Sequence, residues 1–74
     1  MKNAREFVLE FYNVAEFGCL EYCDKGDVYS IERYDEYYNK RATYREMLLA
    51  LGFTWDAIDD LDTRLAAEYA RKHA

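Results

Sequence analysis

The sequence predicts a small all-α protein, a three-helix antiparallel bundle that forms one helical domain over residues 1–74. Three observations support this prediction. Apolar residues recur at three- and four-residue intervals along most of the chain, the period of an amphipathic helix. Proline is absent and glycine numbers only three, which disfavours a loop-rich fold. Turn-forming residues at 24–27 and a corner at Gly52 divide the chain into three helical stretches.

The first helix is predicted to begin at Ala4. Asn3 serves as its N-cap, and Glu6 three residues later completes a loose capping-box pattern. A wide apolar stripe then recurs at helical spacing: Phe7, Val8, Phe11, Val14, Ala15, Cys19 and Tyr22. Three further apolar residues fall outside this stripe: Leu9, Phe17 and Leu20. A helix that is apolar on more than one face usually contacts more than one neighbour, so these three are candidates for an interface.

Residues 24–27, DKGD, are the clearest turn signal in the chain, and residues 19–33 allow two structures. In the first, the helix runs to about Cys23 and a loop leads to Ser30, the N-cap of the next helix. In the alternative, an α+β fold, this stretch forms one short β-hairpin. We favour the helical structure, because an isolated hairpin also needs a helix to cover one of its faces.

The second helix is predicted over residues 31–51. Its apolar and aromatic positions keep a three- or four-residue spacing: Tyr34, Tyr37, Tyr38, Tyr44, Leu48 and Leu51. Arg41 occupies one step of that stripe, where its aliphatic stem packs and its guanidinium reaches water. The alternative is a break near Ala42, because Thr43 with Glu46 offers a second capping box.

A tight corner is predicted at Gly52, which follows an apolar run at the point where a helix needs a residue that tolerates the left-handed conformation. Thr54 then acts as the N-cap of the third helix. Phe53 and Ile58 have the spacing of a hydrophobic staple, which fixes the angle between the incoming chain and that helix.

The third helix is predicted over residues 55–72. One arc of it is apolar and is expected to be buried: Trp55, Ile58, Leu61, Leu65, Ala66 and Tyr69. Asp62 falls inside this arc. Because a carboxylate is rarely buried alone, we expect Asp62 to pair with a tyrosine hydroxyl or an arginine from another helix.

Charge is segregated along the chain, whose net charge is −5. Residues 16–36 hold seven acidic and two basic residues, and residues 37–45 hold three basic residues and no acidic one. Residues 46–62 hold five acidic residues and no basic one. Two acidic blocks therefore flank a basic block. The net charge disfavours direct binding to nucleic acid or to an anionic membrane surface.

The sequence predicts no catalytic residues, no cofactor and no metal site. Its one histidine, His73, lies near the C-terminus, so neither a Ser/His/Asp nor a Cys/His arrangement is credible. Cys19 and Cys23 have too few partners for a zinc site and are expected to be reduced. The low cysteine content and the lack of any apolar run of about 18 residues favour a cytoplasmic protein without a membrane span.

Acidic residues with tyrosines between them favour a non-enzymatic binding protein. Carboxylates spaced along helices can occupy the Lys and Arg sites of a nucleic-acid-binding protein, and tyrosine is favoured at interfaces. The candidate partner-binding residues are Asp56, Asp59, Asp60, Glu32, Asp35, Glu36, Tyr37 and Tyr38. The hypothesis is an inhibitor that occludes or mimics nucleic acid at a basic site of a partner protein, for example a nucleic-acid-binding effector. Phage anti-defence proteins, including anti-CRISPR proteins, are often similarly small and acidic; this is an analogy of size and charge alone.

A second hypothesis comes from a different class of function. The excess apolar surface of the first helix would suit a structural or assembly subunit that forms a homodimer through that helix. Salt distinguishes the two hypotheses, because screening weakens an interface between charged surfaces far more than an apolar one.

Residues 47–58, MLLALGFTWDAI, resemble the first-helix corner of a ubiquitin-associated domain, in which a Met-Gly-Phe loop contacts ubiquitin. Leu51, Gly52 and Phe53 stand at the positions of that loop. The chain departs from the family because it lacks the Met and continues after Ala57 as one long helix, where the family has a further short helix. We therefore carry over no binding residues from this resemblance.

Overall fold

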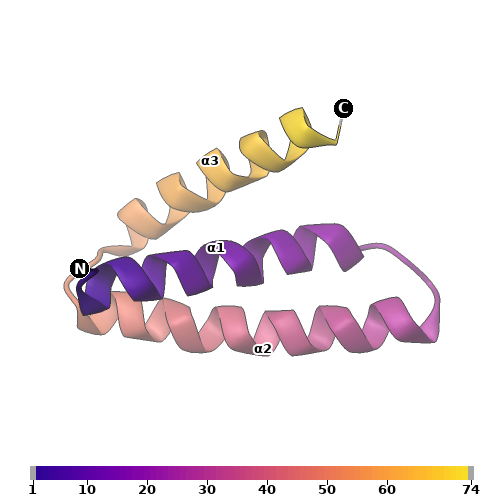
Figure 1. The fold of residues 1–74 in the computed structure, drawn as a ribbon, viewed down its shortest axis with the longest axis horizontal. Coiled ribbons are helices and arrows are strands. Elements are labelled where there is room, and N and C mark those ends of the chain that lie inside the picture. The colour runs from indigo at the N-terminus through magenta and orange to yellow at the C-terminus, as the bar shows by residue number, and fades with distance from the viewer. Residues whose placement is uncertain (1, 74) are drawn as a thin grey trace.

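The protein consists of three α-helices joined by two short connections (Figure 1). In a computed structural model, which describes residues 2–73, α1 spans Ala4–Tyr22, α2 spans Val28–Ala50 and α3 spans Trp55–Lys72. No strand occurs among these described residues. The all-α prediction is confirmed, and the alternative of a hairpin within residues 19–33 is wrong.

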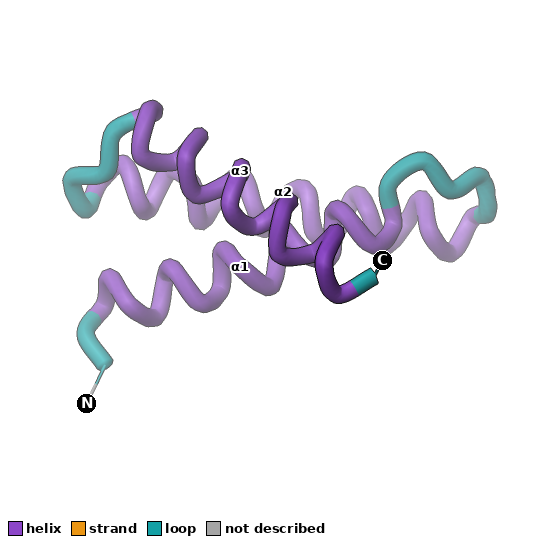
Figure 2. Tube along the Cα trace, turned by 90° about the horizontal axis from the view of Figure 1, so that it is seen from above, coloured by secondary structure: helices purple, strands orange, loops and turns teal. Residues whose placement is uncertain are grey.

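The central helix is α1. It lies antiparallel to α2 along the long axis of the molecule, while α3 crosses on one side (Figures 1 and 2). α3 packs mainly on α1, and it diverges from that helix toward the C-terminus (Figure 1). Leu9 and Phe17, two of the residues outside the predicted stripe, pack against the core, in agreement with a helix that has two neighbours.

Side chains cap α1 and α3 as their sequences predict. The Asn3 Oδ1 atom accepts a hydrogen bond of 2.9 Å from the Glu6 backbone N–H. The Thr54 hydroxyl oxygen accepts one of 3.1 Å from the Ala57 N–H. Each cap satisfies one of the backbone donors that a helix leaves without an internal partner, so the local sequence defines where each helix begins.

α2 begins earlier than predicted and is not broken. Its N-cap is Asp27, whose carboxylate accepts a hydrogen bond of 3.0 Å from the Ser30 N–H, so the prediction of Ser30 as the cap is wrong. Aspartate caps a helix about as well as serine does, and using Asp27 adds the residues 28–30 to the start of α2. The helix continues through Ala42. The Thr43 hydroxyl donates to the Asn39 carbonyl at 3.1 Å and caps nothing, so the alternative of a break is also wrong.

The corner between α2 and α3 is a Schellman motif. Gly52 has a φ of +102°, the left-handed conformation that the sequence predicts there. Its N–H donates to the Leu49 carbonyl at 3.1 Å, and the Phe53 N–H donates to the Leu48 carbonyl at 3.0 Å. These two bonds satisfy carbonyls at the end of α2 and turn the chain directly into α3.

One small core lies between the three helices and contains Tyr12, Leu48, Ile58, Leu61 and Leu65. In α1 the buried stripe is rotated relative to the prediction, because Tyr12 is fully buried while its neighbour Phe11 is exposed. Trp55 and Ala66, which were predicted to be buried, are exposed. Five residues of the apolar stripes predicted in the first two helices are also exposed: Phe7, Phe11, Val14, Tyr38 and Leu51. A chain of this size has too little interior to cover all of its large apolar side chains.

α2 packs directly against the backbone of α1 at Gly18. The ring of Tyr37 lies directly on this glycine, and a Cβ atom at position 18 would overlap the ring. The ring of Tyr22 stacks on the same tyrosine, with 6.1 Å between ring centroids. Gly18 therefore provides the space that lets an aromatic side chain of α2 pack against the backbone of α1.

We expect Gly52→Val to lower the free energy of unfolding by about 1–2 kcal/mol, because a β-branched residue is disfavoured at positive φ. No heavy atom lies within 4 Å of an added Cβ there, so the effect would come from the backbone alone. Gly26→Val is the matched control, since Gly26 is equally open and has no positive φ. Equal loss of stability in both variants, measured by urea unfolding, would contradict this prediction.

Candidate functional site

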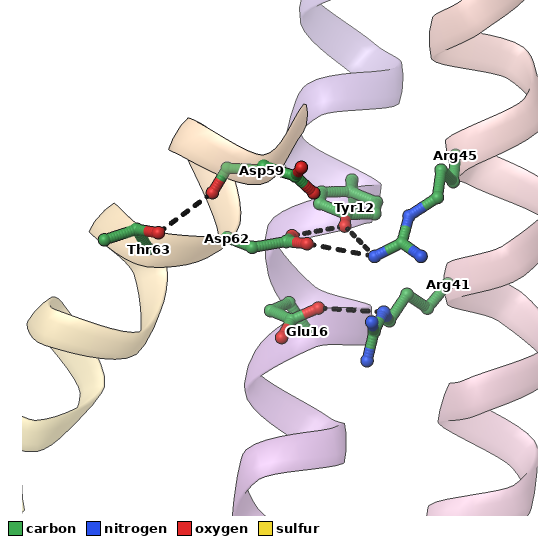
Figure 3. A network of polar contacts seen from close by, with 7 residues as sticks. All are labelled: Tyr12, Glu16, Arg41, Arg45, Asp59, Asp62 and Thr63. Atoms are coloured by element: carbon green, nitrogen blue, oxygen red, sulfur yellow. Dashed lines mark hydrogen bonds and ion pairs between the residues drawn. The ribbon is translucent and has the colours of Figure 1, made fainter. Parts of the chain in front are cut away.

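Two of the three basic residues in the basic block of α2, Arg41 and Arg45, point toward the other helices rather than out to a partner. Arg45 reaches Asp62 on α3, and Arg41 reaches Glu16 on α1 (Figure 3). The third base of the block, Lys40, pairs with Glu36 on its own helix at 3.2 Å. All three basic residues of this block are therefore neutralised by carboxylates of the same chain.

Tyr12, Arg45 and Asp62 form a polar network that joins all three helices (Figure 3). The Tyr12 hydroxyl donates to Asp62 Oδ1. Arg45 Nη2 donates to Asp62 Oδ2 and to the Tyr12 hydroxyl oxygen, each at 3.0 Å. The expectation that Asp62 pairs with a tyrosine or an arginine is confirmed, because it pairs with both. Burial, followed by the hydrogen bond to Asp62, raises the pKa of Tyr12 to about 12.

A second buried ion pair lies one turn away along α1 and α2. Arg41 Nε is 3.1 Å from Glu16 Oε2, and the Glu16 side chain is almost fully covered. The Arg41 guanidinium was predicted to reach water; it pairs with a carboxylate of α1 and its side chain remains 23% exposed. Burial raises the pKa of Glu16, and the positive charge of Arg41 opposes that shift. Both pairs are contacts between helices, which points to a structural role.

The acidic residues at the start of α3 form a different kind of surface. Asp56, Asp59 and Asp60 are exposed, and none of them forms an ion pair with any residue in the described range 2–73. Helix geometry places the three within about 100° of arc. We call these three residues together with Trp55 the acidic surface of α3.

Trp55 was predicted to be buried, but 59% of its surface is exposed. It is the first residue of α3 and lies one turn before Asp59 on the same face. The staple residues Phe53 and Ile58 occupy the core instead, which leaves no room there for the indole. A large exposed aromatic side chain beside carboxylates without partners is typical of a protein-binding surface.

The candidate residues on α2 lie apart from this surface. Glu32, Asp35 and Glu36 are exposed in the first half of α2, and Glu36 is already paired with Arg33 and Lys40. At 1.5 Å per residue, the helix places about 20 Å between Glu36 and the corner where α3 begins. The structure therefore brings the α3 carboxylates together and separates them from the α2 carboxylates.

The two candidate tyrosines differ in exposure. Tyr37 is half-buried against Gly18 and Tyr22, so its ring is part of the contact between α1 and α2. Tyr38 is exposed and stacks on Tyr34 of the same helix, with 6.0 Å between centroids. Of the two, Tyr38 is the more accessible to a partner, with 50% of its surface exposed.

The cysteines take no part in a site. Cys19 is buried and Cys23 is half-buried, both are free, and the Cys23 thiol donates to the Leu20 carbonyl at 3.2 Å. Within residues 2–73 no group of three or more His, Cys, Asp or Glu side chains is arranged to hold a metal ion. No helix in this part of the chain combines the length and the apolar character needed to cross a membrane.

Comparison of the chain with protein-family models, with curated proteins and with solved structures gives no match.

We expect Tyr12→Phe to lower the free energy of unfolding by about 1–2 kcal/mol, because it removes the hydroxyl that joins Asp62 and Arg45 while preserving the ring. The matched control is Tyr38→Phe, the same change at an exposed tyrosine of α2, which should be neutral. Chemical denaturation of the three proteins at neutral pH tests this. Equal stability of the Tyr12→Phe variant and the parent would show that the network contributes nothing.

The same hydroxyl predicts a loss of stability at alkaline pH. The ordinary pKa of tyrosine is 10.0, whereas that of Tyr12 in the folded protein is about 12. Between these values the unfolded chain releases a proton that the folded chain keeps, so the stabilisation present below pH 10 is lost as the pH rises toward 12. The free energy of unfolding should therefore fall less steeply above pH 10 in Tyr12→Phe than in the parent. Identical slopes in the two proteins would contradict this assignment.

Proposed function

We propose that this chain is a non-enzymatic binding protein that uses the acidic surface of α3 to occupy a basic site on a partner protein. At that site it would exclude nucleic acid, by occlusion or by mimicry of its negative charge. The expected partner is a nucleic-acid-binding effector, and the expected setting is the cytoplasm. A role in phage anti-defence, as in anti-CRISPR proteins, is the biological context suggested by the analogy of size and charge.

The observation that supports this proposal most directly is the lack of internal partners for Asp56, Asp59 and Asp60. Seven ion pairs occur within the described residues, and none involves these three carboxylates. The positive end of the α3 dipole stabilises a carboxylate in the first turn, such as Asp56. This effect does not extend beyond that turn, so it does not account for all three carboxylates. Asp59 and Asp60 lie beyond the first turn and are available to a basic partner.

The acidic surface is also held rigidly before any partner arrives. The Thr54 cap and the Schellman corner fix the start of α3, and Ile58 anchors the opposite side of the same turn in the core. Ordered side chains on a fixed helix lose less conformational entropy on binding than residues on a mobile loop. Trp55 adds an aromatic anchor of the kind that dominates the energy of many interfaces.

We expect the double change Asp59→Lys and Asp60→Lys to weaken partner binding by about tenfold or more, mainly through faster dissociation. Stability should change by no more than about 0.5 kcal/mol, because both side chains are exposed. The matched control is Glu32→Lys with Asp35→Lys, which makes the same change in charge on exposed residues of α2. Binding by this control at the parent's affinity would limit the site to α3.

The experiment uses the folded chain as bait on a resin and the partner that it captures as the probe. The captured protein should bind duplex DNA or RNA, and the chain and the nucleic acid should compete for it in a salt-sensitive way. Two results would refute the proposal. One is capture by the Asp59/Asp60 double variant at parental strength, and the other is simultaneous binding of the chain and nucleic acid to the captured protein.

A further inference from the structure

A second surface lies on the side of α1 and α2 away from the start of α3. The end of α3 reaches only its edge, where Val14, Gly18 and Tyr37 line a pocket with Tyr69, Lys72 and His73. Two apolar stripes run along it, each with the alternating three- and four-residue spacing of a helix that packs against another helix. On α1 the stripe is Phe7, Phe11, Val14 and Gly18. On α2 it is Tyr37, Lys40, Tyr44, Met47 and Leu51. We call these two stripes the outer face.

The two stripes meet in a groove lined only by α1 and α2. Its volume is about 310 Å³, and its walls include Phe11, Val14 and Tyr44. Phe7, Phe11 and Tyr44 form a row of stacked rings, with 6.4 Å and 5.7 Å between successive centroids. Phe11 is nevertheless 50% exposed and Val14 60% exposed. The rings are thus ordered by one another but remain open to solvent on one side.

The outer face is nearly free of net charge, in contrast to the rest of the molecule. Lys40 is its only charged residue, and Glu36 neutralises it at 3.2 Å. At its edge Lys2 and Glu10 form another pair. A basic partner finds no unpaired carboxylate here, whereas two copies of this acidic chain can meet here without placing like charges opposite each other.

The dimensions also suit a second copy. α1 and α2 run along the 37 Å axis of the molecule, and two helices of about 10 Å diameter lie side by side. The whole side of α1 and α2 that carries the outer face therefore offers roughly 700 Å², close to the about 800 Å² per partner that a standard stable interface buries. Exposed apolar patches of several hundred Å² often mark interaction sites, and Phe7, Phe11 and Val14 lie on this side.

We propose that the outer face binds a second copy of this chain in a two-fold dimer. With the two-fold axis along the groove, α1 of each copy lies antiparallel against α2 of the other, and the stripes together form a four-helix core. The second copy would cover the aromatic row that the small core of one chain leaves exposed. This gives the homodimer hypothesis a defined surface, which is the row of Phe7, Phe11 and Val14 rather than the predicted Leu9, Phe17 and Leu20.

This arrangement leaves α3 on the outside of each copy. The acidic surface of α3 takes no part in the interface, so a dimer would present two such surfaces. The inference does not depend on the proposed function, because the outer face and the acidic surface of α3 share no residue.

The test compares two substitutions of the same kind, Val14→Glu and Val28→Glu, by measuring molar mass with light scattering across the micromolar range. Val14 belongs to the outer face, whereas Val28, which is 71% exposed, lies in the first turn of α2 outside both stripes. The parent and Val28→Glu should have the mass of a dimer at high and low salt. Val14→Glu should weaken the dimer at least about tenfold, because it places an unpaired carboxylate in an apolar interface.

Met47→Glu tests the stripe on α2. If circular dichroism shows that Val14→Glu does not fold, Met47→Glu replaces it in the comparison. A parent that is monomeric throughout the micromolar range would overturn the dimer and leave the outer face to a different protein. Dimers of Val14→Glu or Met47→Glu as strong as the parent's would also overturn it. So would equal weakening by Val28→Glu, which would indicate a general effect of added charge.

Discussion

The fold depends on one set of hydrogen bonds, those that Asp62 makes with Tyr12 and Arg45. α3 approaches α2 closely only near the corner, where Leu48 and Ile58 share the core, and the ion pair with Arg45 adds a polar link between the two helices. Tyr12 brings α1 into the same network and lies fully buried between the other two. Removing one member of such a group leaves the others buried without partners, and this makes the arrangement far more specific than apolar contact alone. The network and the buried residues Ile58, Leu61 and Leu65 present the same face of α3 to α1.

This network also explains why charge is segregated in the sequence. The basic block of α2 supplies Arg41 to a carboxylate of the first acidic block and Arg45 to a carboxylate of the second. Opposite charges that are far apart in sequence are in this way brought together between helices. Once these internal pairs are formed, the acidic residues of α3 that remain lie together near the corner. A net charge of −5 thus understates how acidic that end of the molecule is.

Local chemistry was enough to predict the helices, since caps at Asn3 and Thr54 and the turn at Gly52 act through neighbouring residues alone. The rotation of α1 could not be predicted in the same way. Val8, Tyr12, Ala15 and Cys19 have the same helical spacing as Phe7, Phe11, Val14 and Gly18, and both rows are apolar. Only the packing of the other helices decides which row is buried.

For the candidate site, the exposure of the α3 carboxylates was predictable from arc geometry. The separation from the α2 carboxylates was not, because it depends on how α3 is placed against α2.

The divergence of α3 has a consequence for how the molecule opens. All of its fully packed residues, Ile58, Leu61 and Leu65, lie before its last two turns, and beyond them the bond between the Tyr69 hydroxyl and Glu21 holds the helix to α1. Backbone amides near the C-terminus should therefore exchange with solvent through fraying that leaves α1 and α2 closed. Amides around Asp62 exchange only when the whole helix detaches, a larger event that also uncovers Tyr12. We therefore expect two units of unfolding, an α1–α2 hairpin and a helix that can leave it.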